Sequence, residues 1–293
     1  TKKFFTTYLM HKSFGLGKIE IILDDKDLEE VVVNNSDEPI WVYHRRHGWL
    51  KTNIILPNED IIKHYSSLIA RKVGRSITML TPLLDAHLDT GDRVNATLFP
   101  ITTKGNTITI RKFSEKPITI TDMLKNKTIS LSAASLIWTA VQYELSTLIT
   151  GGTASGKTSL AGVVCNFFPP NQRIISVEDT RELNLAKHLQ WIPMVTREPN
   201  VEGKGEISML DLIVNSLRMR PDRIIVGEIR KKREAEVLFE AMHTGHSVYA
   251  TLHANDTEET ITRLTNPPID ISKTLLPAIS MIIIMYRNRR TGI

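Results

Sequence analysis

The sequence predicts an α/β protein: a domain built on a mostly parallel sheet, preceded by a smaller α+β domain. The chain has 293 residues, of which 41% are hydrophobic and 24% charged, a globular composition long enough for two cores. Short alternating apolar segments fill its first part, whereas strands alternate with helices in the remainder. A glycine-flanked loop between a predicted strand and a predicted helix, at 151–158, lies near the start of that alternation.

We expect the α+β domain to cover residues 1–116. Alternating apolar residues between turn residues predict its strands at 19–23, 31–33, 40–43, 50–56, 93–99 and 107–113. Between them, Asn58 can cap a helix that ends at Gly74 and packs on the sheet. Residues 117–129 include Pro117 and a short helix, and we assign them as the linker.

The second domain is expected at 130–293, truncated at its C-terminus. Its predicted strands are 143–150, 174–178, 223–227, 247–252 and 279–286, and its predicted helices are 133–144, 158–168, 209–219, 234–243 and 258–264. This alternation is typical of an open, largely parallel sheet that binds ligands at the carboxyl ends of its strands.

Composition and charge limit the classes of protein to which the chain can belong. The net charge of +5 is spread over nearly equal numbers of bases and acids, and we interpret the basic clusters 45–46, 230–233 and 287–290 as solvated surface. Cys165 is the single cysteine, which excludes an internal disulfide and a cysteine-rich metal site, so we expect it in the core. The longest apolar run, 279–286, is too short to span a bilayer and no signal peptide is recognisable, so a cytosolic location is predicted.

The loop at 151–158 carries the strongest motif. Gly151, Gly152, Thr153, Ala154, Ser155, Gly156, Lys157 and Thr158 fit the phosphate-binding pattern G-x-x-x-x-G-K-[ST]. The glycines let successive backbone amides converge on phosphate oxygens, and the following helix adds its positive N-terminal dipole. Lys157 would reach the β- and γ-phosphates and Thr158 would offer its hydroxyl to Mg²⁺. We therefore expect ATP and Mg²⁺ to bind here, with Ser159 of the same helical turn.

Acidic residues follow two of the predicted strands. Glu178 ends strand 174–178, and Glu228 follows strand 223–227, with Gly227 where such strands usually carry an Asp. Either carboxylate could hold Mg²⁺ or orient a water molecule beside the phosphates. The alternative for Glu178 is an acidic turn, and the alternative for Glu228 is a surface position. The sequence does not decide which of the two glutamates is the catalytic base.

A histidine-containing segment surrounds the predicted strand 247–252. His246 precedes this strand and His253 follows it. Since His253 would reach the same edge of the sheet as the loop, it is a candidate sensor of the γ-phosphate. A structural histidine is the alternative, and the spacing matches no common zinc pattern.

In this order and spacing, the loop, the acidic segment 178–182, the segment 217–228 and the histidine segment 246–253 resemble the secretion ATPases of type II secretion, type IV pili and the archaellum. The loop is most similar to the archaeal branch. Segments 84–96 and 110–113 look like the end of that family's N-terminal domain. The resemblance covers about 58–293 and implies a RecA-like P-loop domain.

The resemblance also implies a function. Such proteins form hexameric rings that hydrolyse ATP to drive an inner-membrane platform protein, at the cytoplasmic face of the cell membrane, with a possible peripheral membrane contact. Glu178 and Glu228 match the family's acidic-box and Walker B glutamates. Arg93 and Arg111 match arginines that reach the nucleotide from the N-terminal domain, and Arg75 is a further candidate. Two departures remain: residues 1–57 match no motif, and the chain stops where relatives carry another helical subdomain.

Three other functions stay open. A nucleic-acid motor on the same core would need a basic groove with aromatic residues, but only 6% of the residues are aromatic and none cluster beside basic runs, so we expect no nucleic-acid partner. A nucleotide-gated scaffold with little turnover is a second alternative. A small-molecule kinase is the third, although no motif for a second substrate pocket is recognisable in the sequence.

Overall fold

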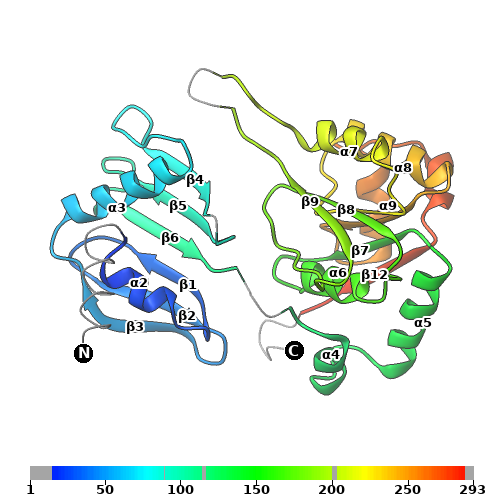
Figure 1. The fold of residues 1–293 in the computed structure, drawn as a ribbon, viewed down its shortest axis with the longest axis horizontal. Helices are drawn as coiled ribbons and strands as arrows, with labels where there is room; N and C mark the ends of the chain where they lie inside the picture. The colour runs from blue at the N-terminus through cyan, green and yellow to red at the C-terminus, as the bar shows by residue number, and fades with distance from the viewer. Residues whose placement is uncertain (1–14, 89, 114–116, 200–202, 288–293) are drawn as a thin grey trace. The chain divides into compact units, whose positions relative to one another are not determined.

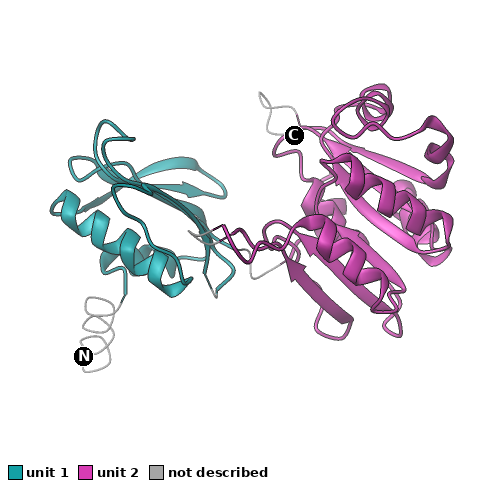
Figure 2. Cartoon of the chain, turned by 90° about the horizontal axis from the view of Figure 1, so that it is seen from above, with its two compact units in different colours: residues 1–114 teal, residues 115–293 magenta. Residues whose placement is uncertain are grey.

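The computed structural model describes residues 15–88, 90–113, 117–199 and 203–287. The chain divides into two compact units, residues 1–114 and 115–293 (Figure 2). Among the described residues, no helix combines the length and the apolar character needed to cross a bilayer.

The first unit is a six-stranded antiparallel sheet with helices on one face (Figure 1). The strand order is β3-β2-β1-β6-β5-β4. The strands are β1 (Leu28–Val33), β2 (Pro39–His44), β3 (Gly48–Ile55), β4 (Leu83–His87), β5 (Arg93–Thr97) and β6 (Thr107–Arg111). Helices α2 (Lys18–Leu23) and α3 (Glu59–Lys72) share one apolar core with the sheet. Asn58 caps α3 by accepting from the Ile61 amide, and Gly74 after the helix has φ +69°, as the sequence predicted.

The predicted strand at 19–23 is wrong, because these residues form α2. Their apolar run satisfies both periods: a strand would place Ile21 on the same face as Ile19, whereas a helix pairs Ile19 with Ile22. Ile19 and Ile22 are buried and Ile21 is 55% exposed, so the helical period applies. Strand β4 was missed as an element.

The second unit is a parallel six-stranded sheet covered by helices on both faces (Figure 1). The strand order is β12-β7-β11-β10-β8-β9. The strands are β7 (Thr147–Gly151), β8 (Arg173–Glu178), β9 (Gln190–Val195), β10 (Arg223–Val226), β11 (Ser247–Leu252) and β12 (Met281–Met285). The predicted fold class, α/β with a smaller α+β unit before it, is confirmed.

The helices divide between two apolar cores. Helices α4 (Ile120–Lys125), α5 (Leu131–Gln142) and α6 (Lys157–Cys165) pack on one face of the sheet. Helices α7 (Met209–Leu217), α8 (Lys232–His243) and α9 (Thr257–Thr265), with the 3-10 helix η1 (Lys273–Ala278), pack on the other. Cys165 is buried in the first of these cores, as expected.

Two expectations for the second unit need correction. The strand predicted at 143–150 begins only at Thr147, because α5 continues to Gln142 and Tyr143 is its C-cap. Strand β9 was missed, and it contains Pro193. Proline lacks the N–H that a central strand needs, but β9 lies at the edge of the sheet, where that loss is tolerated.

All six strands of this sheet run in the same direction, so their carboxyl ends meet at one edge. The phosphate-loop motif follows β7, Glu178 ends β8, Glu228 comes shortly after β10 and His253 directly follows β11. The segments of Glu178, Glu228 and His253 therefore lie at the same edge of the sheet as the phosphate loop.

Candidate active site

The loop after β7 is shaped by backbone geometry that favours glycine. All five residues of β7 are buried. Gly151 has φ +151°, and a Cβ there would lie 2.3 Å from the carbonyl oxygen of Met285 in the paired strand β12. Ala154 has φ +59° and Gly156 φ +93°. The chain thus turns back sharply within a few residues and enters α6.

Helix α6 begins without a side-chain cap, because its N-cap residue is Gly156. The first amides of a helix have no partner within the helix, and they carry the positive end of its dipole. Thr158 and Ser159 lie in this first turn and are partly exposed. Amides at such a helix start can donate to the oxygens of a phosphate.

Lys157 points its ammonium back over the loop. The Nζ atom donates to the carbonyl oxygens of Gly151 and Gly152, each at 2.9 Å, and lies 3.3 Å from Nδ1 of His253. Burial lowers the pKa of Lys157, and the nearby carboxylates of Glu228 and Glu182 oppose that shift. The lysine charge is therefore concentrated at the loop, where the sequence predicted it.

His253 connects Lys157 to Glu228. Its Nε2 lies 3.4 Å from Oε1 of Glu228. Burial and the charge of Lys157 lower the pKa of His253, so the neutral imidazole predominates at neutral pH. Because the ammonium can only donate, Nδ1 must accept from it, which leaves the ring proton on Nε2, facing the carboxylate.

Glu228 sits on a turn that neighbouring strands hold in place. The Gly227 amide donates to the Val177 carbonyl of β8 at 2.8 Å, and the Ile229 amide donates to the Thr251 carbonyl of β11 at 3.0 Å. The Thr251 hydroxyl also donates to the Gly227 carbonyl. The Glu228 side chain, 19% exposed, therefore extends from a rigid support beside the loop lysine.

Glu178 is a buried carboxyl, only 2% exposed. Its Oε1 accepts from the amides of Glu182 and Leu183, both at 3.0 Å, whereas its Oε2 has no hydrogen-bond partner. Burial raises the pKa of Glu178 to about 7, although the two amide bonds act in the opposite direction. A buried oxygen without a partner is costly, and such groups often serve function.

Two expected site residues, Arg93 and Arg111, belong to the first unit. They are direct cross-strand partners on β5 and β6, and both are exposed. Arg93 donates to both carboxylate oxygens of Asp85, from Nε at 3.1 Å and Nη2 at 2.6 Å. Arg75 donates instead to the Asp85 main-chain carbonyl at 2.6 Å. Arg93 and Arg111 therefore form one pair on the sheet of that unit.

His246 does not join His253. It lies before β11, at the opposite end of the strand, and its Nδ1 is 3.2 Å from the Thr244 hydroxyl and 3.3 Å from the Ala241 carbonyl. These are contacts at the end of α8. His246 is therefore structural, and only His253 belongs to the site.

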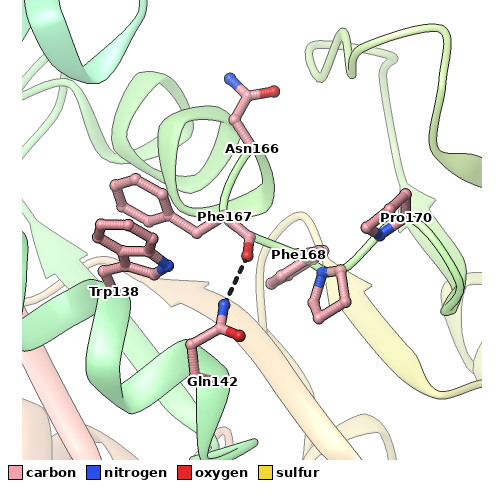
Figure 3. A pocket seen from close by; sticks show the side chains of 7 residues that line it. Trp138, Gln142, Asn166, Phe167, Phe168 and Pro170 are labelled. Atoms are coloured by element: carbon pink, nitrogen blue, oxygen red, sulfur yellow. Dashed lines mark hydrogen bonds between the residues drawn. The ribbon is translucent and has the colours of Figure 1, made fainter.

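A cavity of about 460 Å³ differs in chemistry from the phosphate loop. It lies at the C-terminal end of α6, away from the phosphate loop, and is lined by Trp138, Gln142, Asn166, Phe167, Phe168, Pro169 and Pro170. Figure 3 shows the Trp138 and Phe167 rings stacked, and Gln142 donating to the Phe167 carbonyl at 3.0 Å. No charged side chain lines this cavity, so it does not suit phosphates.

Sequence reasoning missed the contact between Arg230 and Asp179, and considered Asp179 only as part of the acidic segment 178–182. Arg230 was interpreted as solvated surface, yet its guanidinium joins the carboxylates of Glu228 and Asp179. Its position two residues after Glu228 was the only available signal. Arg287 of another basic cluster contacts the loop, with Nη1 3.4 Å from the Ala154 carbonyl, and residues 288–290 of that cluster lie outside the described residues.

Comparisons with known proteins show the family to which the chain is similar. A family model described as "Type II/IV secretion system protein" matches residues 17–286. The putative conjugal transfer protein Rv3659c of Mycobacterium tuberculosis is 32% identical over 258 residues, which is 85% of this chain and 72% of that protein. The type IV secretion system protein PtlH of Bordetella pertussis is 28% identical over 86% of this chain and 80% of its own length.

Higher identity occurs in a longer archaeal protein. The uncharacterized protein MJ0781 of Methanocaldococcus jannaschii is 47% identical over 238 residues, which is 79% of this chain. The chain spans only 32% of that relative, and 49% of a second one from the same organism.

Solved structures share the fold. The Legionella pneumophila ATPase DotB is similar with a TM-score of 0.62 and 22% identity, over 89% of this chain and 70% of that chain. The pilus retraction motor PilT, solved with bound ADP, gives a TM-score of 0.64 and 19% identity over 90% of this chain and 74% of that chain.

Proposed function

The chain belongs to the type II/IV secretion system protein family, and from that premise we propose that it is an ATPase which powers secretion or the assembly of pilus-type filaments. One observation carries the chemical part of this proposal. The loop lysine, a histidine and a strand-end carboxylate form a continuous chain of contacts, Lys157 to His253 to Glu228, at the carboxyl edge of the parallel sheet.

ATP would bind at the loop. Backbone amides of residues 151–156 and of the first turn of α6, with Thr158 and Ser159, would donate to the phosphate oxygens. Lys157 would exchange its bonds to the Gly151 and Gly152 carbonyls for the β- and γ-phosphates. Since its charge is already held over the loop, little reorganisation is needed.

The two glutamates would have different places in the site. Glu228 is in contact with the histidine that touches Lys157, so we assign it the attacking water, which it would orient and deprotonate. His253, neutral and with its proton on Nε2, would be placed to respond to the γ-phosphate through the same contacts. Glu178 is held further inside the sheet by two backbone amides.

Mg²⁺ fits the residues present. The unpartnered buried Oε2 of Glu178, the Thr158 hydroxyl in the first turn of α6 and the Glu228 carboxylate are hard oxygen ligands of the kind this ion takes. In the described part of the chain, no group of three or more His, Cys, Asp and Glu side chains could hold a metal ion. Mg²⁺ commonly binds through few protein oxygens together with substrate phosphates, and would supply charge neutralisation there.

Arg93 and Arg111 would complete the site from the first unit. Two neighbouring guanidinium groups on an exposed sheet face can stabilise the charge that develops on a transferred phosphoryl group, an effect worth about 10³-fold or more elsewhere. We propose that they reach a nucleotide bound by a second unit, of the same chain or of a neighbouring copy. Arg75 remains the weaker candidate.

At the level of the assembly, we propose a homo-hexameric ring at the cytoplasmic face of the cell membrane, acting on an inner-membrane platform protein. Family membership supports this, as do relatives named for type IV secretion and conjugal transfer. A peripheral membrane contact and the absence of a nucleic-acid partner belong to the same proposal.

Substituting each glutamate by glutamine tests the chemistry. Glu228→Gln should still bind ATP but lose hydrolysis by roughly 10²-fold or more, because the amide is nearly isosteric but cannot accept the water proton. The measurement is steady-state ATP turnover together with the Kd of a fluorescent nucleotide. If Glu178→Gln removes turnover while Glu228→Gln retains it, the base is Glu178 and the assignment made above is wrong.

A further inference from the structure

Arg230 joins two acidic side chains that come from different strands. Its Nη1 donates to Oδ2 of Asp179 at 2.6 Å, while its Nε and Nη2 both donate to Oε2 of Glu228, at 2.9 Å and 2.6 Å. Asp179 follows β8 and Glu228 follows β10, two neighbouring strands. One guanidinium thus ties together the carboxyl ends of both.

The backbone beneath Arg230 is fixed. The carboxylate of Glu234, 5% exposed, accepts from the amides of Arg230 at 3.2 Å and Lys231 at 3.1 Å. On the other side, the Thr196 hydroxyl lies within hydrogen-bond distance of both the main-chain carbonyl and Oδ1 of Asp179. The Arg230 backbone and the Asp179 side chain at the two ends of this ion-pair bridge are therefore anchored, although the Arg230 side chain itself is 58% exposed.

The bridge acts on only one oxygen of Glu228. Both donors reach Oε2, and Oε1 is the oxygen that faces His253 at 3.4 Å. The terminal torsion of a glutamate is soft and broadly populated, so without this bond the carboxylate could rotate. With Oε2 held, Oε1 stays directed toward His253 and, through it, toward Lys157.

We propose that Arg230 is the positioning residue of Glu228 in ATP hydrolysis, and that Asp179 braces it. The proposal rests on the ATPase function proposed above, and in it Arg230 makes no contact with the nucleotide. An isolated pair at this exposure would stabilise the fold little. Its effect lies in orientation, since misplacing a reacting group by about 1 Å can cost about 10²-fold in rate.

An arginine is needed for this task. Its planar fork donates from Nε and Nη2 on one side and from Nη1 on the other, so one side chain can satisfy both carboxylates in a fixed geometry. A lysine would supply the charge from a single flexible point. Arg230→Lys should therefore recover only part of what Arg230→Gln loses.

The test compares ATPase kinetics of the full chain across a small set of variants. Arg230→Gln should lower kcat roughly 10- to 100-fold, with KM and the Kd of a fluorescent nucleotide changed less than about twofold. Arg230→Lys should fall between this variant and the wild type. Arg233→Gln is the matched control, because Arg233 is three residues away, 77% exposed and paired with Glu236, and should keep wild-type kcat. Thermal unfolding of each variant checks the fold.

The brace is tested by a double-mutant cycle. Asp179→Asn alone should lower kcat less than Arg230→Gln, and the double variant should be no slower than Arg230→Gln, because both changes break one chain of contacts. Additive losses would overturn the role of Asp179. A kcat of Arg230→Gln within twofold of wild type, or a nucleotide affinity that falls in parallel with kcat, would overturn the proposal while leaving the ATPase assignment intact. A wild-type chain with no Lys157-dependent turnover would overturn both.

Discussion

At the scale of single residues, the contacts of Lys157 hold its charge over the loop. Lys157 uses all three ammonium N–H groups on the Gly151 carbonyl, the Gly152 carbonyl and His253. Each of these partners is a neutral acceptor, so the lysine charge remains available to an anion. The Glu228 carboxylate contacts the other side of the same imidazole.

Glu178 should make stability depend on pH. Its pKa is raised from 4.5 to about 7 in the folded protein, so the folded state binds a proton more tightly than the unfolded state does. The stabilisation is complete below pH 4.5 and is lost as the pH rises through 7. A shift of this size corresponds to about 3 kcal/mol in the free energy of unfolding.

Urea unfolding of the wild type and of Glu178→Gln at several pH values measures this effect. The wild type should lose stability relative to the variant between pH 4.5 and about 8, because glutamine does not ionise. Below pH 4.5 the difference between the two proteins should be constant. Parallel stability curves over the whole range would mean that Glu178 is not a buried, titrating carboxyl.

At the scale of elements, the capping residues distinguish α6 from α5, α7 and α9. The N-cap residues of α5, α7 and α9 are Ser130, Ser208 and Asp256, whose side chains accept from first-turn amides. Helix α6 begins at Gly156 and has no such acceptor. Its N-terminus therefore keeps its donors for a ligand, which is the arrangement expected of a phosphate-binding loop.

Gly151 links this loop to strand β12. A Cβ at this position would lie 2.3 Å from the Met285 carbonyl and 2.5 Å from the Ser155 hydroxyl oxygen, at φ +151°. We expect Gly151→Ala to lower the free energy of unfolding by about 1–3 kcal/mol, through backbone strain and a displaced β12. Denaturant unfolding measures the change.

Gly152→Ala is the matched control for Gly151→Ala. Its φ is ordinary, and a Cβ there would meet only the Asn255 side-chain oxygen, at 3.0 Å, which can move. Equal losses in the two variants would contradict the proposed contact between the loop and β12.

Some elements of the fold could be predicted from the sequence and others could not. The motif at 151–158, the strand 247–252 and the N-cap at Asn58 were predictable, because each depends on local chemistry. The run at 19–23 was not, since five residues cannot separate the helical period from the strand period, and only the packing of Ile19 and Ile22 decides. Strand β9 was hidden by Pro193, whose tolerance depends on a place at the sheet edge.

The candidate site, too, could be predicted only in part from local sequence. Glu178, Glu228 and His253 could be proposed from the sequence because strand ends of a parallel sheet converge. The contact of Arg230 with Asp179 could not, because Asp179 lies 51 residues earlier in the chain. A contact between distant segments leaves no local pattern in the sequence.

At the scale of the whole molecule, we propose that residues of both units take part in hydrolysis. The phosphate loop belongs to the second unit, and Arg93 with Arg111 to the first. Arg93→Ala should lower turnover steeply and ATP affinity much less, because the arginine would act on transition-state charge. If it acts across a boundary between copies, mixing Arg93→Ala with Lys157→Ala protein should restore part of the activity. No recovery in the mixture would place the arginine within one chain.

In the proposed function, the loop at 151–158 binds ATP for hydrolysis. ATP turnover by Lys157→Ala is measured against the wild type in the same assay, with circular dichroism to confirm the fold. Removing the ammonium should abolish turnover, since it takes away the charge that Lys157 holds against the Gly151 and Gly152 carbonyls of the loop. A Lys157→Ala protein that hydrolyses ATP at the wild-type rate would contradict the account.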